Sequence, residues 1–377
     1  MLIGAVGLPQ APSSSVLASV PMTVLANAPY IEATMNGRGP FTFEVDTGSM
    51  TSPLAREEAQ EMGFSAGSSA HTATFGVGGL RLPIPTSFAS FEGLGALPGR
   101  RIYGDVGYGV LRQYVVEIDY ARGRLTIHDP ARFVYHGSGT AFPASLEMGY
   151  DPQIDGVLDV KGLAPIPVRL TLDTGAGGTV VSSPIVRQHH LVEHATAVVP
   201  SLRRKALADG VNGAVFDTVT ARIEQLQIGP YVFDRPLVAL SRDTDGTFAM
   251  DDIGVNLGGN VLRRFTVIVD YPHRRVILEP NEHLHDPFLA DASGLVLTTV
   301  GGTMHAFMIH GIVPGSAAAE AGCRDGDEIT AIDGRPAREY ALWQVQDLLR
   351  EAPQARRLTL RRRGRTVNVE LKLRPLA

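Results

Sequence analysis

The sequence has few of the features that mark disulfide-stabilised, membrane-spanning or nucleic-acid-binding proteins. Its 377 residues contain one cysteine, Cys323, which excludes a disulfide within the chain but says little about compartment. No apolar run is long enough to cross a bilayer. The net charge of −5 provides no basic field for nucleic acid, and the basic run at 356–365 is typical of a solvated strand and turn.

Tryptophan is equally scarce, with Trp343 alone, yet a hydrophobic fraction of 44% and a charged fraction of 19% are those of a folded chain. The length predicts two or three domains. The 41 glycines and 25 prolines favour short strands joined by tight turns. Residues 1–27 lack the basic start of a signal peptide, so we expect a loose N-terminal arm or the remnant of a trimmed signal peptide.

Two parts of the chain repeat each other. Residues 41–48, FTFEVDTG, alternate in polarity and run into a tight turn, and residues 168–175, VRLTLDTG, do the same. Further along, residues 110–120, VLRQYVVEIDY, match residues 261–271, VLRRFTVIVDY. A basic turn and another apolar strand follow each match. A repeat of this length indicates a duplicated domain.

The repeat sets the expected domain boundaries. Both repeated lobes are predicted to be mainly strand, because apolar residues alternate with a period of two. We expect a short helix after each Asp-Thr-Gly turn, at 53–62 and 184–193. The expected segments are lobe one at 28–138, lobe two at 139–281, a polar linker at 282–293 and a third domain at 294–377.

Each repeat ends one strand in Asp-Thr-Gly. Two carboxylates held about 3 Å apart cannot both ionise, so one can take a proton from water while the other polarises a carbonyl. We expect each threonine hydroxyl to bond across to the opposite loop, and each glycine to let the two backbones approach. This pattern predicts one shared site that hydrolyses peptide bonds without a metal or organic cofactor. Its candidate residues are Asp46, Thr47, Gly48, Asp173, Thr174 and Gly175.

The residues after the two glycines differ. Ser49 follows the first motif and Ala176 follows the second. Because a hydroxyl near a carboxylate favours its charged form, we expect Asp46 to carry more of the negative charge and Asp173 to hold the proton more often.

With both motifs in the same place in a repeat, residues 30–278 resemble the pepsin and retropepsin superfamily of aspartic peptidases. The resemblance implies a mainly β fold with two pseudo-symmetric β-barrel lobes, aspartic endopeptidase activity on peptides or proteins, and a periplasmic or extracellular location, although nothing in the sequence excludes the cytoplasm. That family packs an apolar-apolar-glycine segment beneath each loop. The counterparts here, Asp105-Val106-Gly107 and Asn256-Leu257-Gly258, both depart from it by beginning with a polar residue.

The same family covers its substrate with a glycine-tipped hairpin, called the flap. Glycine-rich segments in both lobes suit such a mobile lid, and they suit ordinary hairpins equally. The flap candidates are Phe75, Gly76, Val77 and Gly78 in lobe one and Gly210, Val211 and Asn212 in lobe two.

Residues 294–375 resemble a PDZ domain of the bacterial type, on the segments 314–322, 326–327 and 332–334. The resemblance implies binding of a peptide C-terminus, which adds as a strand beside a helix. The alternative is a PDZ domain that only packs on the peptidase. The implied peptide-binding residues are Ser293, Gly294 and Leu295 in the carboxylate loop and Leu342 and Val345 on the helix.

Three other interpretations remain open. The sequence HLVEH at 190–194 matches a zinc-peptidase pattern, although a solvated surface helix explains it equally simply. The lobes could be a catalytically silent scaffold for a peptide-binding PDZ domain. The lobes of two chains could also pair, but a covalent tether favours a monomer whose site forms within one chain.

Overall fold

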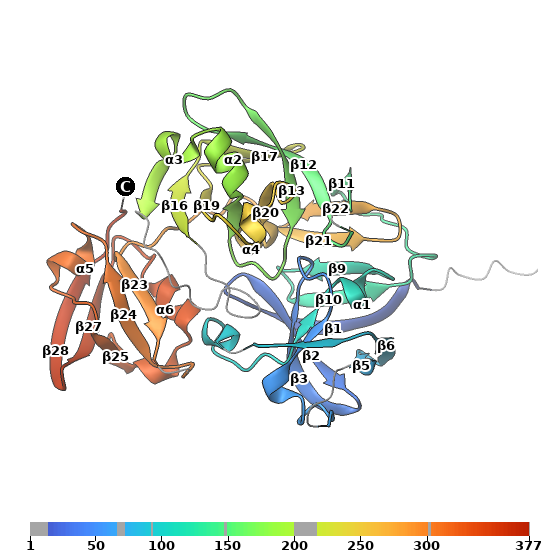
Figure 1. Ribbon diagram of the computed structural model, residues 1–377, viewed down its shortest axis with the longest axis horizontal. Helices are drawn as coiled ribbons and strands as arrows, with labels where there is room; N and C mark the ends of the chain where they lie inside the picture. Colours follow the sequence, from blue (N-terminus) through green and yellow to red (C-terminus); the bar gives the residue numbers. More distant parts are fainter. Residues whose placement is uncertain are drawn as a thin grey trace, which may run out of the picture.

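The computed structural model describes residues 14–65, 72–91, 93–146, 149–199, 217–300 and 303–376. Two β lobes are followed by a smaller β domain, which lies to one side of them (Figure 1). This confirms the mainly β fold class. No helix in these ranges has the length and apolar character needed to cross a bilayer.

Lobe one is built almost entirely from short strands. The prediction of a loose N-terminal arm is wrong in part. Residues 16–25 form a strand that pairs with the strands at 28–35 and 124–128. Met22 and Leu25 of this strand are buried in the lobe. The prediction of a helix at 53–62 is also wrong, because a short strand and a single 3-10 turn lie there. The elements are β1 (Val16–Leu25), β2 (Ala28–Met35), β3 (Arg38–Val45), β4 (Pro53–Ala55), η1 (Arg56–Glu58), β5 (Ala73–Val77), β6 (Leu80–Ile84), β7 (Ser87–Ala89), η2 (Leu94–Ala96), β8 (Asp105–Val106), α1 (Tyr108–Leu111), β9 (Val115–Asp119) and β10 (Arg124–His128).

Lobe two repeats this plan with the same pairings. The strand before each Asp-Thr-Gly pairs in parallel with the short strand before a helix, β3 with β8 and β13 with β20. The helix expected at 184–193 is present as α2 and α3. The elements are β11 (Thr140–Pro143), β12 (Gln153–Asp159), β13 (Ile166–Leu172), β14 (Thr179–Val181), α2 (Ser183–Gln188), α3 (Leu191–His194), β15 (Thr196–Val199), β16 (Thr218–Arg222), β17 (Gln225–Ile228), β18 (Tyr231–Asp234), β19 (Leu237–Ser241), η3 (Thr247–Ala249), β20 (Val255–Leu257), α4 (Gly259–Leu262), β21 (Phe265–Asp270) and β22 (Arg275–Pro280).

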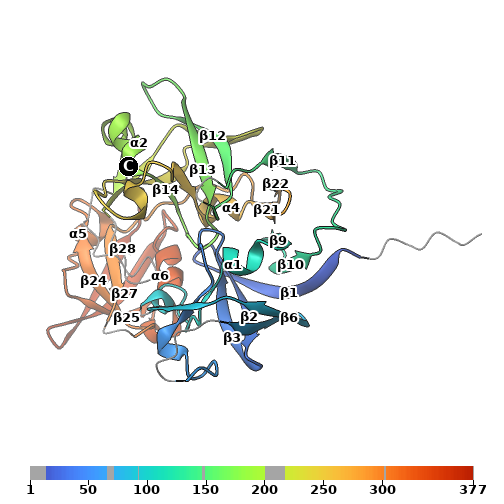
Figure 2. The same ribbon diagram turned by 45° about the vertical axis from the view of Figure 1, so that its right-hand side comes forward.

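One sheet joins the two lobes. Its strands run in the order β11-β22-β21-β9-β10-β1, so the two repeated strands β9 and β21 are direct neighbours. They pair antiparallel, with Val267 opposite Ile118, and both side chains are fully buried. Figures 1 and 2 show β21 and β22 of lobe two beside β9 and β10 of lobe one, near the centre of the molecule. The lobes therefore share one hydrophobic core and cannot separate without breaking this sheet.

The third domain has its own sheet and core. Its strand order is β23-β24-β25-β27-β28, and Phe307, Leu342 and Leu358 lie in its buried cluster. The helix expected over 340–350 is present. The elements are β23 (Leu295–Thr299), β24 (Phe307–Ile312), α5 (Ala317–Glu320), β25 (Glu328–Ile332), β26 (Arg335–Pro336), η4 (Ala337–Glu339), α6 (Leu342–Leu348), β27 (Ala355–Arg362) and β28 (Arg365–Lys372).

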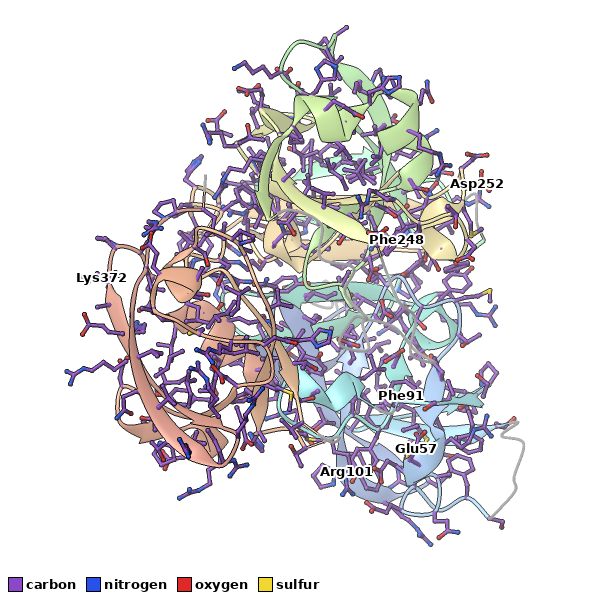
Figure 3. The ribbon with its side chains drawn as sticks, turned by 60° about the vertical axis from the view of Figure 1, so that its left-hand side comes forward. Glu57, Phe91, Arg101, Phe248, Asp252 and Lys372 are labelled. Atoms are coloured by element: carbon purple, nitrogen blue, oxygen red, sulfur yellow. The ribbon has the colours of Figure 1, made fainter. Side chains whose placement is uncertain are left out.

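The third domain contacts lobe one through its helix α6. Trp343 packs against a buried cluster that includes Leu25 and Phe91, and its backbone N–H donates to the carbonyl of Leu97 at 3.3 Å. Leu97 itself packs on the core of the third domain. Figure 3 shows the domain against both lobes and labels Glu57, Phe91 and Arg101 in lobe one, Phe248 and Asp252 in lobe two, and Lys372 on the third domain.

We expect the fluorescence of Trp343, the single tryptophan, to report this contact. Leu97→Asp places a charge against the apolar face of the third domain, so the domain should detach and the emission of Trp343 should shift to the red. The exposed control Val134→Asp should leave the spectrum unchanged. Identical spectra for Leu97→Asp and the native protein would contradict the contact.

Candidate active site

The two Asp-Thr-Gly loops lock together through their threonines. The backbone N–H of Thr47 donates to the hydroxyl oxygen of Thr174, and the N–H of Thr174 donates to that of Thr47, both at 3.1 Å. Each hydroxyl then donates across the interface, Thr47 to the carbonyl of Leu172 at 2.7 Å and Thr174 to that of Val45 at 2.6 Å. Both threonines are fully buried, so four buried hydrogen bonds fix the approach of the loops. The expected threonine bonds are confirmed.

The glycines let the aspartates face each other. A Cβ added to Gly48 would lie 2.7 Å from Cγ of Asp173, and one added to Gly175 would lie 2.6 Å from Cγ of Asp46. Real Cβ atoms are not found this close to other atoms, so no larger residue fits either position. Each aspartate therefore packs directly on the opposite loop, within one chain.

A short strand beneath each loop holds its aspartate at the strand end. The N–H of Asp46 donates to the carbonyl of Val106, and that of Asp173 to the carbonyl of Leu257, both at 3.1 Å. The segments expected beneath the loops, at 105–107 and 256–258, are thus confirmed in place. Their polar first residues do not disturb the packing of the two lobes.

The two carboxylates receive different hydrogen bonds in the described part of the chain. Asp46 accepts from the N–H of Gly48 at 2.8 Å. Asp173 accepts from the N–H of Ala176 at 2.9 Å and from the side-chain amide of Asn256 at 2.6 Å. Two donors stabilise a negative charge on Asp173 more than one donor does on Asp46.

The surroundings of Asp46 work against its charged form. Burial raises the pKa of Asp46 well above its usual range, and the neighbouring carboxyl groups of Asp173, Asp105 and Glu44 add to the effect. The N–H of Gly48 opposes this shift only in part. The burial of Asp46 and the two donors on Asp173 therefore run against the expectation from Ser49 that Asp46 is the more charged member.

Further acidic residues surround the pair and were missed as site residues by the sequence analysis. Burial raises the pKa of Glu44 to about 7, and the hydroxyl of Tyr30 donates to this carboxylate at 2.7 Å. Burial also raises the pKa of Asp151 to about 8, with Asp173 contributing. One signal for Glu44 was present in the repeat: it occupies the place of the neutral Thr171.

A cavity of about 390 Å³ opens beside the loop of Asp46. Met50 and Thr51 line it directly after the first motif, and Tyr108 and Tyr150 form part of its wall. The charges of both Asp46 and Asp173 raise the pKa of Tyr150, after burial and Asp151, so this cavity lies within electrostatic reach of the pair.

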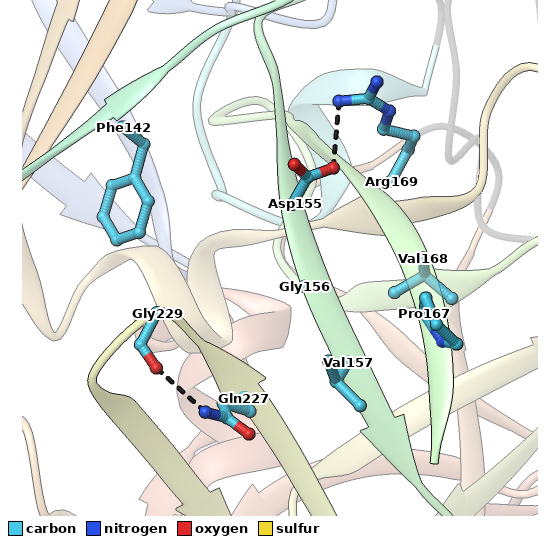
Figure 4. Close-up of a pocket in the computed structure, with 9 residues that line it drawn as sticks. All are labelled: Phe142, Asp155, Gly156, Val157, Pro167, Val168, Arg169, Gln227 and Gly229. Carbon is cyan, nitrogen blue, oxygen red and sulfur yellow. Dashed lines mark hydrogen bonds and ion pairs between the residues drawn. The ribbon is translucent and has the colours of Figure 1, made fainter. Parts of the chain in front are cut away.

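A second hollow, of about 550 Å³, lies on lobe two (Figure 4). Strands β12 and β13 supply most of its lining, including an ion pair of 3.0 Å between Asp155 and Arg169. Neither Asp-Thr-Gly loop contributes to it. The first cavity is therefore the better candidate for a substrate side chain.

The flap candidates of lobe one lie in a hairpin that packs within the lobe, and their role as a flap stays a prediction. Phe75, Gly76 and Val77 belong to β5, which pairs with β2 and β6 inside the lobe. The ring of Phe75 packs edge-on against Phe43 at 5.4 Å, and both are buried. The turn at Gly78 lies against β1. Strands β5 and β6 therefore form a hairpin that is packed into the lobe. The lobe-two candidates Gly210, Val211 and Asn212 lie outside the described residues.

The expected peptide-binding residues of the third domain are engaged internally. The N–H groups of Ser293 and Gly294 donate to the carboxylate of Asp291, at 3.1 and 2.5 Å, and the N–H of Leu295 donates to the hydroxyl of Ser293 at 3.0 Å. The side chains of Leu342 and Val345 are fully buried in the domain core. These five residues are therefore engaged within the domain, and their role in binding a peptide C-terminus stays a prediction.

The zinc pattern is not arranged on one helix. Helix α3 begins after His190, whose backbone is left-handed, and Nδ1 of His194 lies 3.2 Å from the carbonyl of Lys161. In the ranges that the structure describes, no group of three His, Cys, Asp or Glu side chains is placed to hold a metal ion.

Comparison with known proteins identifies a PDZ domain at residues 308–362, which confirms this prediction for the third domain. No curated protein matches the chain. Among solved structures, it is similar to an aspartic proteinase from Irpex lacteus, with 15% identity, 72% of this chain and 99% of that chain covered, and a TM-score of 0.46. It is also similar to a photosystem II D1 C-terminal processing protease, with 30% identity, 23% of this chain covered and a TM-score of 0.22, and it spans 24% of that protein. The HtrA3 PDZ domain bound to a phage-derived ligand gives 17% identity, 23% and 86% coverage, and a TM-score of 0.21.

The acidic surroundings of the pair predict that the fold loses stability as pH rises. The pKa values of Glu44 and Asp151, about 7 and about 8, exceed their usual values, so the folded state holds protons that the unfolded chain has released. This stabilisation is complete below about pH 4 and is lost as pH rises through 7 to 8. The Tm measured by calorimetry should therefore fall by several degrees between pH 5 and pH 8.

Glu44→Gln should reduce that fall, because it keeps an acceptor for Tyr30 and removes one titrating group. The exposed control Glu370→Gln should keep the native pH dependence. A Tm that rises between pH 5 and pH 8 would show that these carboxyl groups are not buried as described.

Proposed function

We propose that the protein is an aspartic endopeptidase that hydrolyses peptide bonds in peptides or proteins through Asp46 and Asp173. The observation that carries the proposal is the pair of threonine-locked loops, which bring two carboxyl groups face to face within one chain. A duplicated scaffold without catalysis has no need to exclude a Cβ at both contact points. Like-charged groups this close are destabilising unless they share a proton, and a shared proton is what this chemistry uses.

The hydrogen bonds assign the roles. Asp173, with two donors, is the base that takes a proton from a water molecule held between the two carboxyl groups. The resulting hydroxide adds to the carbonyl carbon of the peptide. Asp46, whose pKa burial raises, gives its proton to the carbonyl oxygen. Asp173 then donates its proton to the leaving amine nitrogen, Asp46 takes back the hydroxyl proton as the carbonyl reforms, and the pair returns to its starting state.

In this proposal the PDZ domain is an accessory module that takes no part in peptide-bond hydrolysis. Its helix α6 packs on lobe one through Trp343, and its loop amides are bonded to Asp291 and Ser293. These contacts support the interpretation in which the domain packs on the peptidase. They also disfavour a silent scaffold that serves only to present a peptide-binding groove.

Asp46→Asn and Asp173→Asn should each reduce kcat on an unfolded protein substrate by about 10³-fold or more, because an amide can neither take nor give the shared proton. Circular dichroism should show that both variants remain folded. Asp155→Asn, which changes an exposed carboxylate of lobe two, is the matched control and should keep full activity. Near-native hydrolysis by either dyad variant would reject the proposal.

A single chain should be sufficient for activity. When inactive Asp46→Asn protein is mixed with inactive Asp173→Asn protein, no hydrolysis should return, since the shared sheet ties both lobes of one chain to the same site. The measurement is the rate in the mixture over a range of concentrations. Recovery that grows with concentration would show instead that lobes of different chains pair.

A further inference from the structure

The two lobes place different residues at one equivalent position beneath the catalytic pair. On β8, Asp105 lies opposite Glu44 of β3, and on β20, Asn256 lies opposite Thr171 of β13 in the same parallel register. Asn256 uses this position to donate its side-chain N–H to Asp173 at 2.6 Å. Asp105 therefore occupies, beneath Asp46, the place from which lobe two supplies a hydrogen-bond donor.

Among the residues that the structure describes, none donates a hydrogen bond that would support a negative charge on Asp105. Only 3% of its surface is exposed, and its Oδ1 is buried without a partner in the described part of the chain. An ionised carboxylate oxygen left in this state is destabilising, whereas a protonated oxygen is a donor that can satisfy itself on a neighbouring acceptor.

The groups facing Asp105 are themselves acidic. They are Glu44 from β3, Asp46 directly after this strand, Tyr30 from β2 and Asp173 from lobe two. The hydroxyl of Tyr30 is already donated to Glu44, so it does not serve Asp105. In agreement with this geometry, burial raises the pKa of Asp105 well above its usual range, with Glu44 and Asp173 contributing.

Building on the proposed peptidase function, we propose that Asp105 is a positioning residue that stays in its neutral acid form and donates its O–H to the carboxyl group of Asp46, as the amide of Asn256 does for Asp173. The neutral acid orients Asp46 and adds no charge beside it. Ionisation of Asp105 removes the donor and places a negative charge next to the dyad. The alkaline limit of hydrolysis is then set partly by Asp105, which does not touch the substrate.

The test compares Asp105→Asn with Asp105→Leu on an unfolded protein substrate from pH 4 to pH 9. Asp105→Leu removes the donor and should lower kcat on the order of ten- to a hundredfold at pH 5, with KM nearly unchanged. Asp105→Asn keeps a donor that cannot ionise, so it should rescue most of this loss and move the alkaline limb of kcat to higher pH. The same pair is measured in the Glu44→Gln background, which removes the titration of the carboxyl group that pairs with Asp105.

The reciprocal change Asn256→Asp gives lobe two the residue of lobe one. It adds a second buried acid beneath the dyad and should move the alkaline limb to lower pH. If Asp105→Leu keeps native kcat, or if Asp105→Asn keeps the native pH profile in both backgrounds, the role proposed for Asp105 is overturned.

Infrared spectroscopy separates this inference from the proposed function. At pH 6 the protonated-carboxyl absorption of the native protein should exceed that of Asp105→Asn by one carboxyl group, because Glu44 and Asp151 contribute to both, whether or not either protein hydrolyses a substrate. Absence of this difference means that Asp105 is ionised and overturns the inference while leaving the peptidase proposal intact. A native protein that shows this difference from Asp105→Asn but hydrolyses no substrate would instead reject the peptidase proposal. If Asp105→Leu fails to fold, the pH profile of Asp105→Asn and its infrared difference from the native protein still test the role of Asp105.

Discussion

The reciprocal hydrogen bonds of Thr47 and Thr174 are the contact on which the rest of the site depends. Both side chains are fully buried, and each bonds to the backbone of the opposite lobe twice. Removing one hydroxyl leaves buried partners unsatisfied, at a cost of about 1–3 kcal/mol for each group. The close approach of Gly48 and Gly175 to the opposite aspartates follows from this lock, and the proton sharing that we propose for the two carboxyl groups depends on it.

The shared sheet makes this lock rigid. Because β9 and β21 are adjacent strands of one sheet, a relative movement of the lobes would shear paired strands whose side chains form a common core. The dyad therefore lies between elements that cannot easily move apart. The PDZ domain contacts lobe one through Trp343 of its helix α6 and Leu97 of the lobe, and neither residue belongs to this central sheet.

The backbone of the site could be read from the sequence, and its electrostatics could not. The repeated Asp-Thr-Gly turns, the alternation before them and the duplicated β9 and β21 strands are local patterns, and each fixes a pairing. Burial is a property of the assembled fold, so the pKa of Glu44 and the missing partner of Asp105 depend on contacts that no local pattern reveals. A glycine-rich hairpin has the same sequence pattern whether it covers a site or packs in a core, so only the fold shows that Phe75 packs against Phe43. An apolar helix face can likewise line a core or a groove, so only the fold shows that Leu342 is fully buried.

The internal repeat shows where the two lobes have diverged and what each difference does. At two equivalent positions lobe two carries the neutral Thr171 and Asn256, while lobe one carries the acids Glu44 and Asp105. The neutral pair in lobe two provides fixed donors whatever the pH, whereas the acids in lobe one behave as donors only while they are protonated. Carboxyl groups that are buried close together repel one another when they ionise. The cluster of Glu44, Asp46 and Asp105 therefore has its lowest free energy with several protons bound. The conditions that stabilise lobe one are thus the conditions in which Asp46 keeps the proton that the proposed chemistry requires, so folding and the proposed catalysis favour the same acidic range.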